Sequence, residues 1–211
     1  MSVYARLVQL GYQGVEAGIY PDRQIYKKIR DAADGLVIAM LAEVERQTRR
    51  RPELAQGRSD TRNWKLGDPE LMHELRRAAL HLEDFGRLPV PPPGVIDPTG
   101  DPLLRDAFRE AGPGKLSHLI RHAESSGIYV PLMFPRAFWM EEPGLSVGSA
   151  PGLLLETEKL AGILANEEPS SPWLEAADFL SGIREACKAS VATGLTVELY
   201  YEKGISSAGE V

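Results

Sequence analysis

Apolar residues recur at spacings of three and four along the first half of the chain, which is the period of an amphipathic helix. Between residues 22 and 50, six such residues fall on one stripe: Ile25, Ile29, Ala32, Leu36, Met40 and Val44. Asp68 and Pro69 then supply an N-cap and a first helical residue, and Gly86 supplies a left-handed end. The pattern therefore predicts helices at 22–50 and 69–85, joined by an exposed loop at 53–66.

The second half combines further helical stripes with β-branched and aromatic runs. Four more helices are expected, at 101–112, 116–127, 150–165 and 172–193. The runs at 128–134 and 195–201 predict strands, and Pro131 would confine the first of them to an edge or a bulge. Residues 1–20 fit neither pattern cleanly. Together the elements predict a mainly α fold, or an α+β fold with about six helices and a small minor sheet.

A proline-rich stretch at residues 88–98 interrupts the pattern. Proline fixes φ and excludes helix, so this stretch is interpreted as a stiff connector. A chain of 211 residues suits one domain of ordinary size or two small ones. We expect a single globular domain over 1–211, with 88–98 as the place where it would divide into two lobes.

The composition is that of an ordinary soluble domain, with 43% hydrophobic and 26% charged residues. Cys187 is the single cysteine, so an internal disulfide is excluded. Residues 1–6 lack the pattern of a signal peptide, and the longest dense apolar run, 36–42, falls far short of the roughly 20 residues of a membrane span. We expect a cytoplasmic protein without a membrane segment. Phosphate-binding glycine motifs are absent from the sequence, and no cofactor is expected.

The formal net charge of -6 is spread unevenly along the chain. Residues 46–65 carry seven cations and two acids, a balance of +5, whereas residues 139–178 carry eight acids and one lysine, a balance of -7. Both segments could lie on solvated faces or pair with each other. The overall acidity argues against generic binding to nucleic acid or to anionic lipid.

Residues 144–148 match the G-x-S-x-G pattern of a hydrolase nucleophile elbow. That elbow needs a strand directly before it and a histidine after the serine. Residues 140–143 do not suit a strand, and all four histidines precede Ser146. We therefore expect a turn at 144–148, followed by a helix that Ser149 caps. Cys187 lies on the apolar stripe of the last helix, where a thiol is inert.

His118 and His122 are four residues apart, a spacing that lets two imidazoles face one metal ion. The apolar stripe of their helix lies on another side, so both imidazoles are expected to point toward solvent or a wet groove. No third ligand is identifiable nearby. A metal site and ordinary surface histidines both fit this pattern.

The favoured function is a non-catalytic protein that binds a protein partner, of cationic character, through an acidic surface. Acidic side chains speed the encounter with a cation, and an aromatic anchor supplies a desolvated contact. The candidate residues are Glu141, Glu142, Glu156, Glu158 and Trp139. In composition and size the chain is similar to bacterial immunity proteins, which neutralise basic toxins, so an inhibitory role is the sharper form of this hypothesis.

Two other classes of function stay open. One is an enzyme whose site is assembled from distant residues, beginning with His118, His122 and Glu124, with or without a metal. The other is anion or nucleic-acid binding through Arg49–Lys65, with candidate residues Arg49, Arg50, Arg51, Arg58, Arg62 and Trp64. Arginines after a helix also complement its dipole, which requires no ligand.

Overall fold

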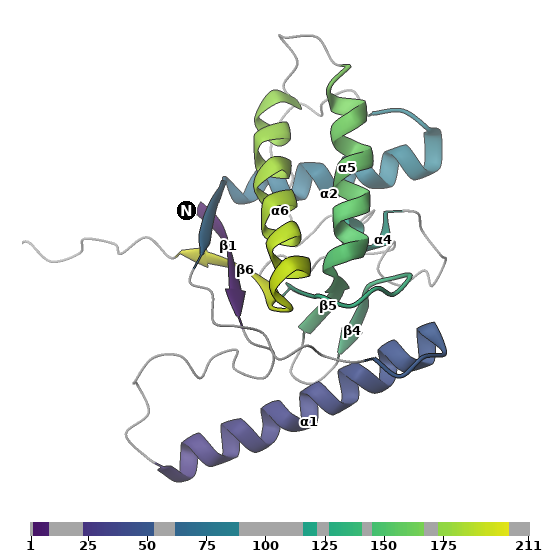
Figure 1. The fold of residues 1–211 in the computed structure, drawn as a ribbon. Coiled ribbons are helices and arrows are strands. Elements are labelled where there is room, and N and C mark those ends of the chain that lie inside the picture. The colour runs from purple at the N-terminus through teal and green to yellow at the C-terminus, as the bar shows by residue number, and fades with distance from the viewer. Residues whose placement is uncertain are drawn as a thin grey trace, which may run out of the picture.

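The protein is built around a six-stranded sheet (Figure 1). The computed structural model describes residues 2–8, 23–52, 62–88, 116–121, 127–140, 145–166 and 173–202. The strands are β1 (Ser2–Val8), β2 (Asn63–Gly67), β3 (Gly127–Val130), β4 (Phe138–Met140), β5 (Leu145–Ser149) and β6 (Thr196–Glu202). Such a sheet is a main layer of the fold. The expectation of a mainly α fold, or of an α+β fold with a small minor sheet, is therefore wrong.

The strand order is β2-β1-β6-β3-β5-β4. The β3–β5 pair is parallel, and the other neighbouring strands are antiparallel. Strand β1 pairs with β6 along its whole length, with Ser2 opposite Glu202 and Val8 opposite Thr196. The centre of the sheet therefore joins the two ends of the described chain, a pairing that no local pattern in the sequence reveals.

Five helices lie within the described residues: α1 (Arg23–Thr48), α2 (Pro69–Phe85), α4 (Ser117–Ile120), α5 (Ala150–Leu164) and α6 (Trp173–Thr193). The Asp68 side chain accepts the backbone N–H of Glu70 at 3.1 Å and caps α2, and Gly86 ends that helix with φ 70. The Ser149 hydroxyl accepts the backbone N–H of Gly152 at 2.9 Å and caps α5. The helices predicted at 22–50, 69–85, 150–165 and 172–193 are confirmed.

Helices α5 and α6 pack on one face of the sheet, α2 packs against α6 and α4, and together they bury the larger core. Its strand residues include Ala5, Leu7, Tyr129, Val197 and Leu199, and its helix residues include Leu75, Leu153, Leu160, Phe179, Leu180 and Ile183. Figure 1 shows α5 and α6 side by side in front of α2. Apolar side chains at every second strand position supply this face, as the period of a strand requires.

Helix α1 packs on the opposite face and closes the smaller core. This core consists of Met40 and Val44 from α1 with Ile128, Val130, Phe134 and Val147. The alternation within β3 divides its side chains between the cores, because Tyr129 enters the larger one and both of its neighbours enter the smaller one. In Figure 1, α1 runs along the lower side of the molecule, beyond the strands.

Several local expectations need correction. Strand β2 replaces the end of the loop expected at 53–66, and β1 lies in the ambiguous region 1–20. Strand β3 lies between β6 and β5, inside the sheet and not at an edge or bulge as expected. This position is possible because the strand ends at Val130, one residue before Pro131. The strand expected at 195–201 is confirmed as β6. The expected helix 101–112 and most of the connector 88–98 lie outside the described residues.

Candidate functional site

The described acidic side chains that face solvent on the α5–α6 pair are Glu158, Asp178 and Glu185, which we call the hairpin acids. They occupy the sides of the two helices that point away from the larger core, because the opposite sides carry the buried leucines. Cations share this surface. Lys159 is exposed next to Glu158, and the Lys188 ammonium contacts the Glu185 carboxylate at 2.9 Å.

Trp139 lies on β4, the strand at one edge of the sheet, and 40% of its surface is exposed. It is therefore accessible to a partner, as the aromatic-anchor hypothesis requires. Phe134 is only 1% exposed and belongs to the smaller core. Glu141 and Glu142 follow β4 directly in the sequence and lie outside the described residues.

Glu156 does not belong to the acidic surface, so the sequence-based expectation for this residue is wrong. It is 7% exposed and faces inward from α5. Its Oε1 accepts the backbone N–H of His118 at 2.9 Å, and its Oε2 accepts that of Leu119 at 2.8 Å. These are free N–H groups of the first turn of α4, so the carboxyl group caps that short helix from a distant part of the chain.

Burial raises the pKa of Glu156 to about 8. The two backbone N–H groups and Lys159 lower it, whereas Glu83 adds to the rise. A desolvated carboxyl group favours its neutral form unless its partners outweigh the loss of water. Glu156 is thus a structural carboxyl group. The segment 139–178 therefore has fewer carboxylates available to contact a partner than its sequence suggests.

His118 is buried, with 2% of its surface exposed, and not directed toward solvent as expected. Its Nδ1 accepts the backbone N–H of Ser149 at 3.2 Å, which leaves Nε2 as the N–H that donates to the Phe134 carbonyl at 3.0 Å. Burial lowers the pKa of this imidazole to about 4, so it is neutral near pH 7. Gly152 leaves room for the ring, because a Cβ there would lie 2.5 Å from its Cδ2 and Nε2.

This geometry counts against the proposed metal pair. A neutral imidazole that uses one nitrogen as an acceptor and the other as a donor has no lone pair left for a metal. His122 and Glu124 lie outside the described residues. Among the residues that the structure describes, no group of three or more potential ligands could hold a metal ion.

Ser146 lies within β5, so the expected turn at this position is wrong. Its side chain is buried, and its hydroxyl donates to the Arg121 carbonyl at 2.8 Å. The Cys187 thiol is fully buried, and burial followed by the charge of Glu156 raises its pKa. A buried strand serine that bonds to a carbonyl and a neutral thiol inside the core are both poor nucleophiles.

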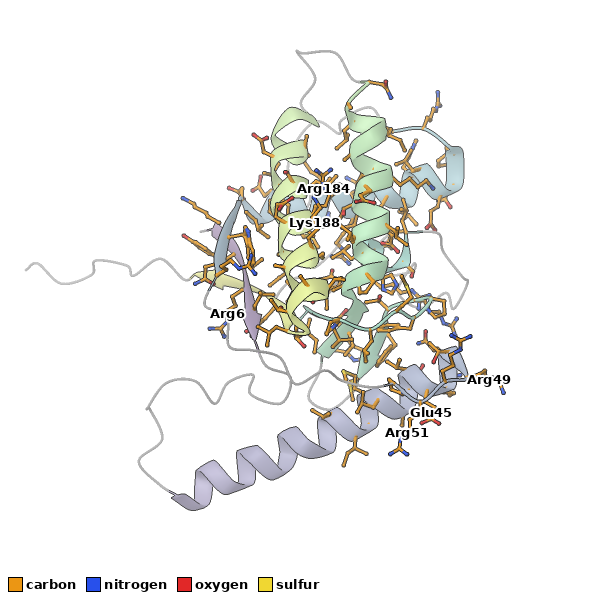
Figure 2. The ribbon with its side chains drawn as sticks, in the orientation of Figure 1. Arg6, Glu45, Arg49, Arg51, Arg184 and Lys188 are labelled. Atoms are coloured by element: carbon orange, nitrogen blue, oxygen red, sulfur yellow. The ribbon has the colours of Figure 1, made fainter. Side chains whose placement is uncertain are left out.

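The basic segment is divided between two places. Arg49 and Arg51 lie at the C-terminal end of α1 (Figure 2), whereas Arg62 and Trp64 belong to the region of β2, at the other edge of the sheet from β4. The Arg62 guanidinium lies 5.7 Å from the centre of the Trp64 ring, and that ring also packs against the larger core. The described candidates for one anion site are therefore not brought together, and Arg58 lies outside the described residues.

The network around His118 and Glu156 was missed by the sequence reasoning, although α5 contained a signal. Glu156 lies three residues after Leu153 and four before Leu160, which places it on the buried stripe of that helix. An acid at such a position needs a partner inside the core. The identity of that partner depends on a contact across 38 residues of sequence, and no periodicity could supply it.

Among the described residues, no helix is long and apolar enough to cross a membrane. The chain matches no curated protein and no solved structure. A family model does match it, over residues 18–199, and that family is described as "Putative DNA-mimic protein". Since the match covers far more than half of the sequence, this protein belongs to the DNA-mimic family.

Proposed function

We propose that this protein is a non-catalytic, acidic protein that binds a DNA-binding protein by presenting carboxylates in the place of duplex phosphates. Family membership over residues 18–199 is the observation that carries the proposal. The acidic balance of residues 139–178 and the solvent-facing hairpin acids support it. The contact surface would then include Glu158 on α5, Asp178 on α6 and Trp139 at the edge of the sheet. Glu141 and Glu142, which lie outside the described residues, are proposed as further contacts from the sequence alone.

Electrostatics explains how such a surface competes with DNA. A DNA-binding protein gains most of its non-specific affinity from lysine and arginine side chains that neutralise phosphates. Carboxylates on a rigid helix offer the same charge without the bases. Glu158 on α5 and Asp178 on α6 are exposed and offer such carboxylates, whereas the carboxylate of Glu185 is paired with Lys188. A cationic groove that accepts them is closed to the duplex.

The consequence for the partner is inhibition, because the mimic and the DNA occupy the same cationic surface. An immunity role is the special case in which that partner is a basic, DNA-cutting toxin. We further propose that the protein acts in the cytoplasm, where a bacterial DNA-binding partner meets its duplex.

Competition with DNA tests the proposal. The tagged full chain is used to capture proteins from an extract of its source cells, and each captured protein is then purified. Its complex with a fluorescent DNA duplex is titrated with the chain while fluorescence anisotropy is followed. We expect the chain to displace the duplex, and we expect its affinity to fall as salt rises. A captured protein whose DNA binding is unaffected by saturating amounts of the chain would contradict the proposal.

Matched charge reversals test the surface. The double variant Glu158→Lys/Asp178→Lys should weaken displacement about tenfold or more. The control Glu70→Lys/Asp84→Lys changes the net charge equally, and both of its positions are exposed on α2. It should leave displacement within about threefold of the unmodified chain. Equal losses in both variants would show that overall charge, and not the hairpin, drives binding.

A further inference from the structure

Three consecutive arginines, Arg49, Arg50 and Arg51, follow the last residue of α1, and all three are exposed. We call them the arginine turn. Figure 2 shows Arg49 and Arg51 at this end of the helix. Within the described residues, no ion pair joins a carboxylate to any of the three. Since α1 packs on the face of the sheet opposite to α5 and α6, the arginine turn lies apart from the hairpin acids.

The backbone is held where the arginines leave the helix. Arg49 is the one described non-glycine residue with a positive φ, 58, and its N–H donates to the Glu45 carbonyl at 2.8 Å. The Thr48 hydroxyl then accepts the backbone N–H of Arg50 at 3.3 Å. A fixed backbone lowers the entropy that is lost when the side chains bind an anion.

The positive charge at this end of α1 exceeds what the helix dipole needs, which is about half an elementary charge. Arg46, in the last turn, contacts the Glu43 carboxylate at 2.6 Å. The pKa of Glu43 is lowered chiefly by this guanidinium and further by the charge of Arg136, so one carboxylate serves two cations. Glu45 is exposed nearby. Two glutamates and five arginines therefore give a balance of +3, from Glu43 and Glu45 against Arg46, Arg49, Arg50, Arg51 and Arg136.

The acidity of the whole chain does not oppose an anion here. The net charge is -6 and residues 139–178 carry -7, so the rest of the chain carries +1. Exposed charges more than about 10 Å apart are largely screened at 0.1 M salt. The three cations are all arginines, whose planar guanidinium groups bind phosphate oxygens in pairs.

We propose that the arginine turn binds the phosphate backbone of duplex DNA without reading its sequence. A duplex carries one negative charge per about 1.7 Å of its axis, a density of anions that suits three adjacent guanidinium groups. Contacts to phosphates alone position a duplex and carry no sequence information. Because the arginine turn and the hairpin acids lie on opposite sides of the sheet, the chain can hold a duplex and a DNA-binding protein at the same time.

Direct binding of the full chain to a fluorescent duplex of arbitrary sequence, followed by anisotropy without any partner, tests the proposal. Three neutralised phosphates predict that the affinity falls about 40-fold between about 50 and about 200 mM salt. Arg50→Gln/Arg51→Gln leaves one arginine in the turn, so the fall over the same range should shrink to about fourfold. Circular dichroism verifies that the variant keeps its helix content.

The control Lys159→Gln/Lys188→Gln removes the same charge from exposed positions on α5 and α6 and should keep the salt dependence of the unmodified chain. The proposal is overturned if the chain does not bind the duplex at low salt, or if both double variants lose affinity equally. Displacement of the duplex by poly-glutamate at the same concentration of charge would instead assign the arginine turn to an acidic protein. In the displacement experiment on a captured protein, Arg50→Gln/Arg51→Gln should still compete with DNA, which separates this site from the proposed function.

Discussion

The two faces of the sheet carry their helices in different ways. On one face α2, α5 and α6 bury a continuous core in which Leu153, Phe179 and Ile183 are 0% exposed. On the other face the described buried residues form a smaller core, in which Met40 and Val44 of α1 meet Phe134 and the strand residues Ile128, Val130 and Val147. The exposed acids Glu158 and Asp178 thus lie on helices that bury the larger of the two described cores, and α1 packs on the smaller one. A charged surface that must keep its shape is supported by the larger core.

The largest effect is expected from Phe179→Ala in the larger core. Removing a fully buried aromatic ring loses its transfer free energy and leaves a cavity, so the free energy of unfolding should fall by about 3–5 kcal/mol. Urea denaturation followed by circular dichroism measures this loss. A loss below about 1 kcal/mol would mean that the larger core does not dominate stability, and the comparison of the two faces would fail.

A smaller and more local effect is expected from Val44→Ala in the smaller core. The substitution removes two buried methyl groups and should cost about 2 kcal/mol, mainly in the docking of α1. Hydrogen exchange should show faster exchange along the C-terminal half of α1 and unchanged protection in α5 and α6. If α5 and α6 lost protection to the same extent, the two faces would form one cooperative unit.

The buried pair Glu156 and His118 predicts how stability depends on pH. Between pH 6.5 and 8 the folded chain retains the Glu156 proton that the unfolded chain has lost, so stability falls as pH rises. His118 acts in the opposite direction. Between about pH 4 and 6.5 its imidazole is protonated in the unfolded chain but neutral in the folded one, so its contribution to stability falls as pH decreases. The two effects oppose each other between pH 4.5 and 6.5, where stability should change little.

Above pH 6.5 the effect of Glu156 stands alone. The free energy of unfolding should decrease by about 1–2 kcal/mol from pH 6.5 to 8. Urea midpoints at several pH values measure the slope, and Glu156→Gln should flatten it whatever its own cost in stability. The exposed neighbour gives the control, since Glu158→Gln should leave the slope unchanged. A slope that persists in Glu156→Gln would assign it to another group.

The helices could be predicted from the sequence because their signals are local. Asp68, Gly86 and Ser149 act on their own helix ends, and each was identified correctly. The sheet could not be predicted because β1 pairs with β6 across the length of the chain and β2 is only five residues long. The segment of β3 was predicted as a strand from its β-branched and aromatic residues, but its position inside the sheet was not, because that position depends on pairing with the distant strand β6.

The composition of the candidate site could be predicted from the sequence, but the burial of its individual side chains could not. The acidity of residues 139–178 was visible in the sequence, and exposed Glu158 fits it. The charge count could not separate Glu158 from Glu156, because only the packing of α5 against α4 decides which carboxylate leaves the surface. His118 was misplaced for the same reason. The helix expected at 116–127 is a single turn, Ser117–Ile120, in the described residues. All four residues of so short a helix are buried, so the helical period of the sequence did not indicate which side of it faces solvent.

The smallest effect is expected at the end of α1, where Arg49 has φ 58, the left-handed conformation that glycine adopts at no steric cost. Its N–H donates to the Glu45 carbonyl at 2.8 Å, so the conformation closes the helix. Arg49→Gly keeps that bond and removes the strain of the side chain, which should stabilise the protein by about 0.5–1 kcal/mol relative to Arg49→Ala. Comparing those two variants cancels the loss of the charge. Thermal denaturation measures the difference, and equal midpoints would show that α1 frays before its end conformation matters.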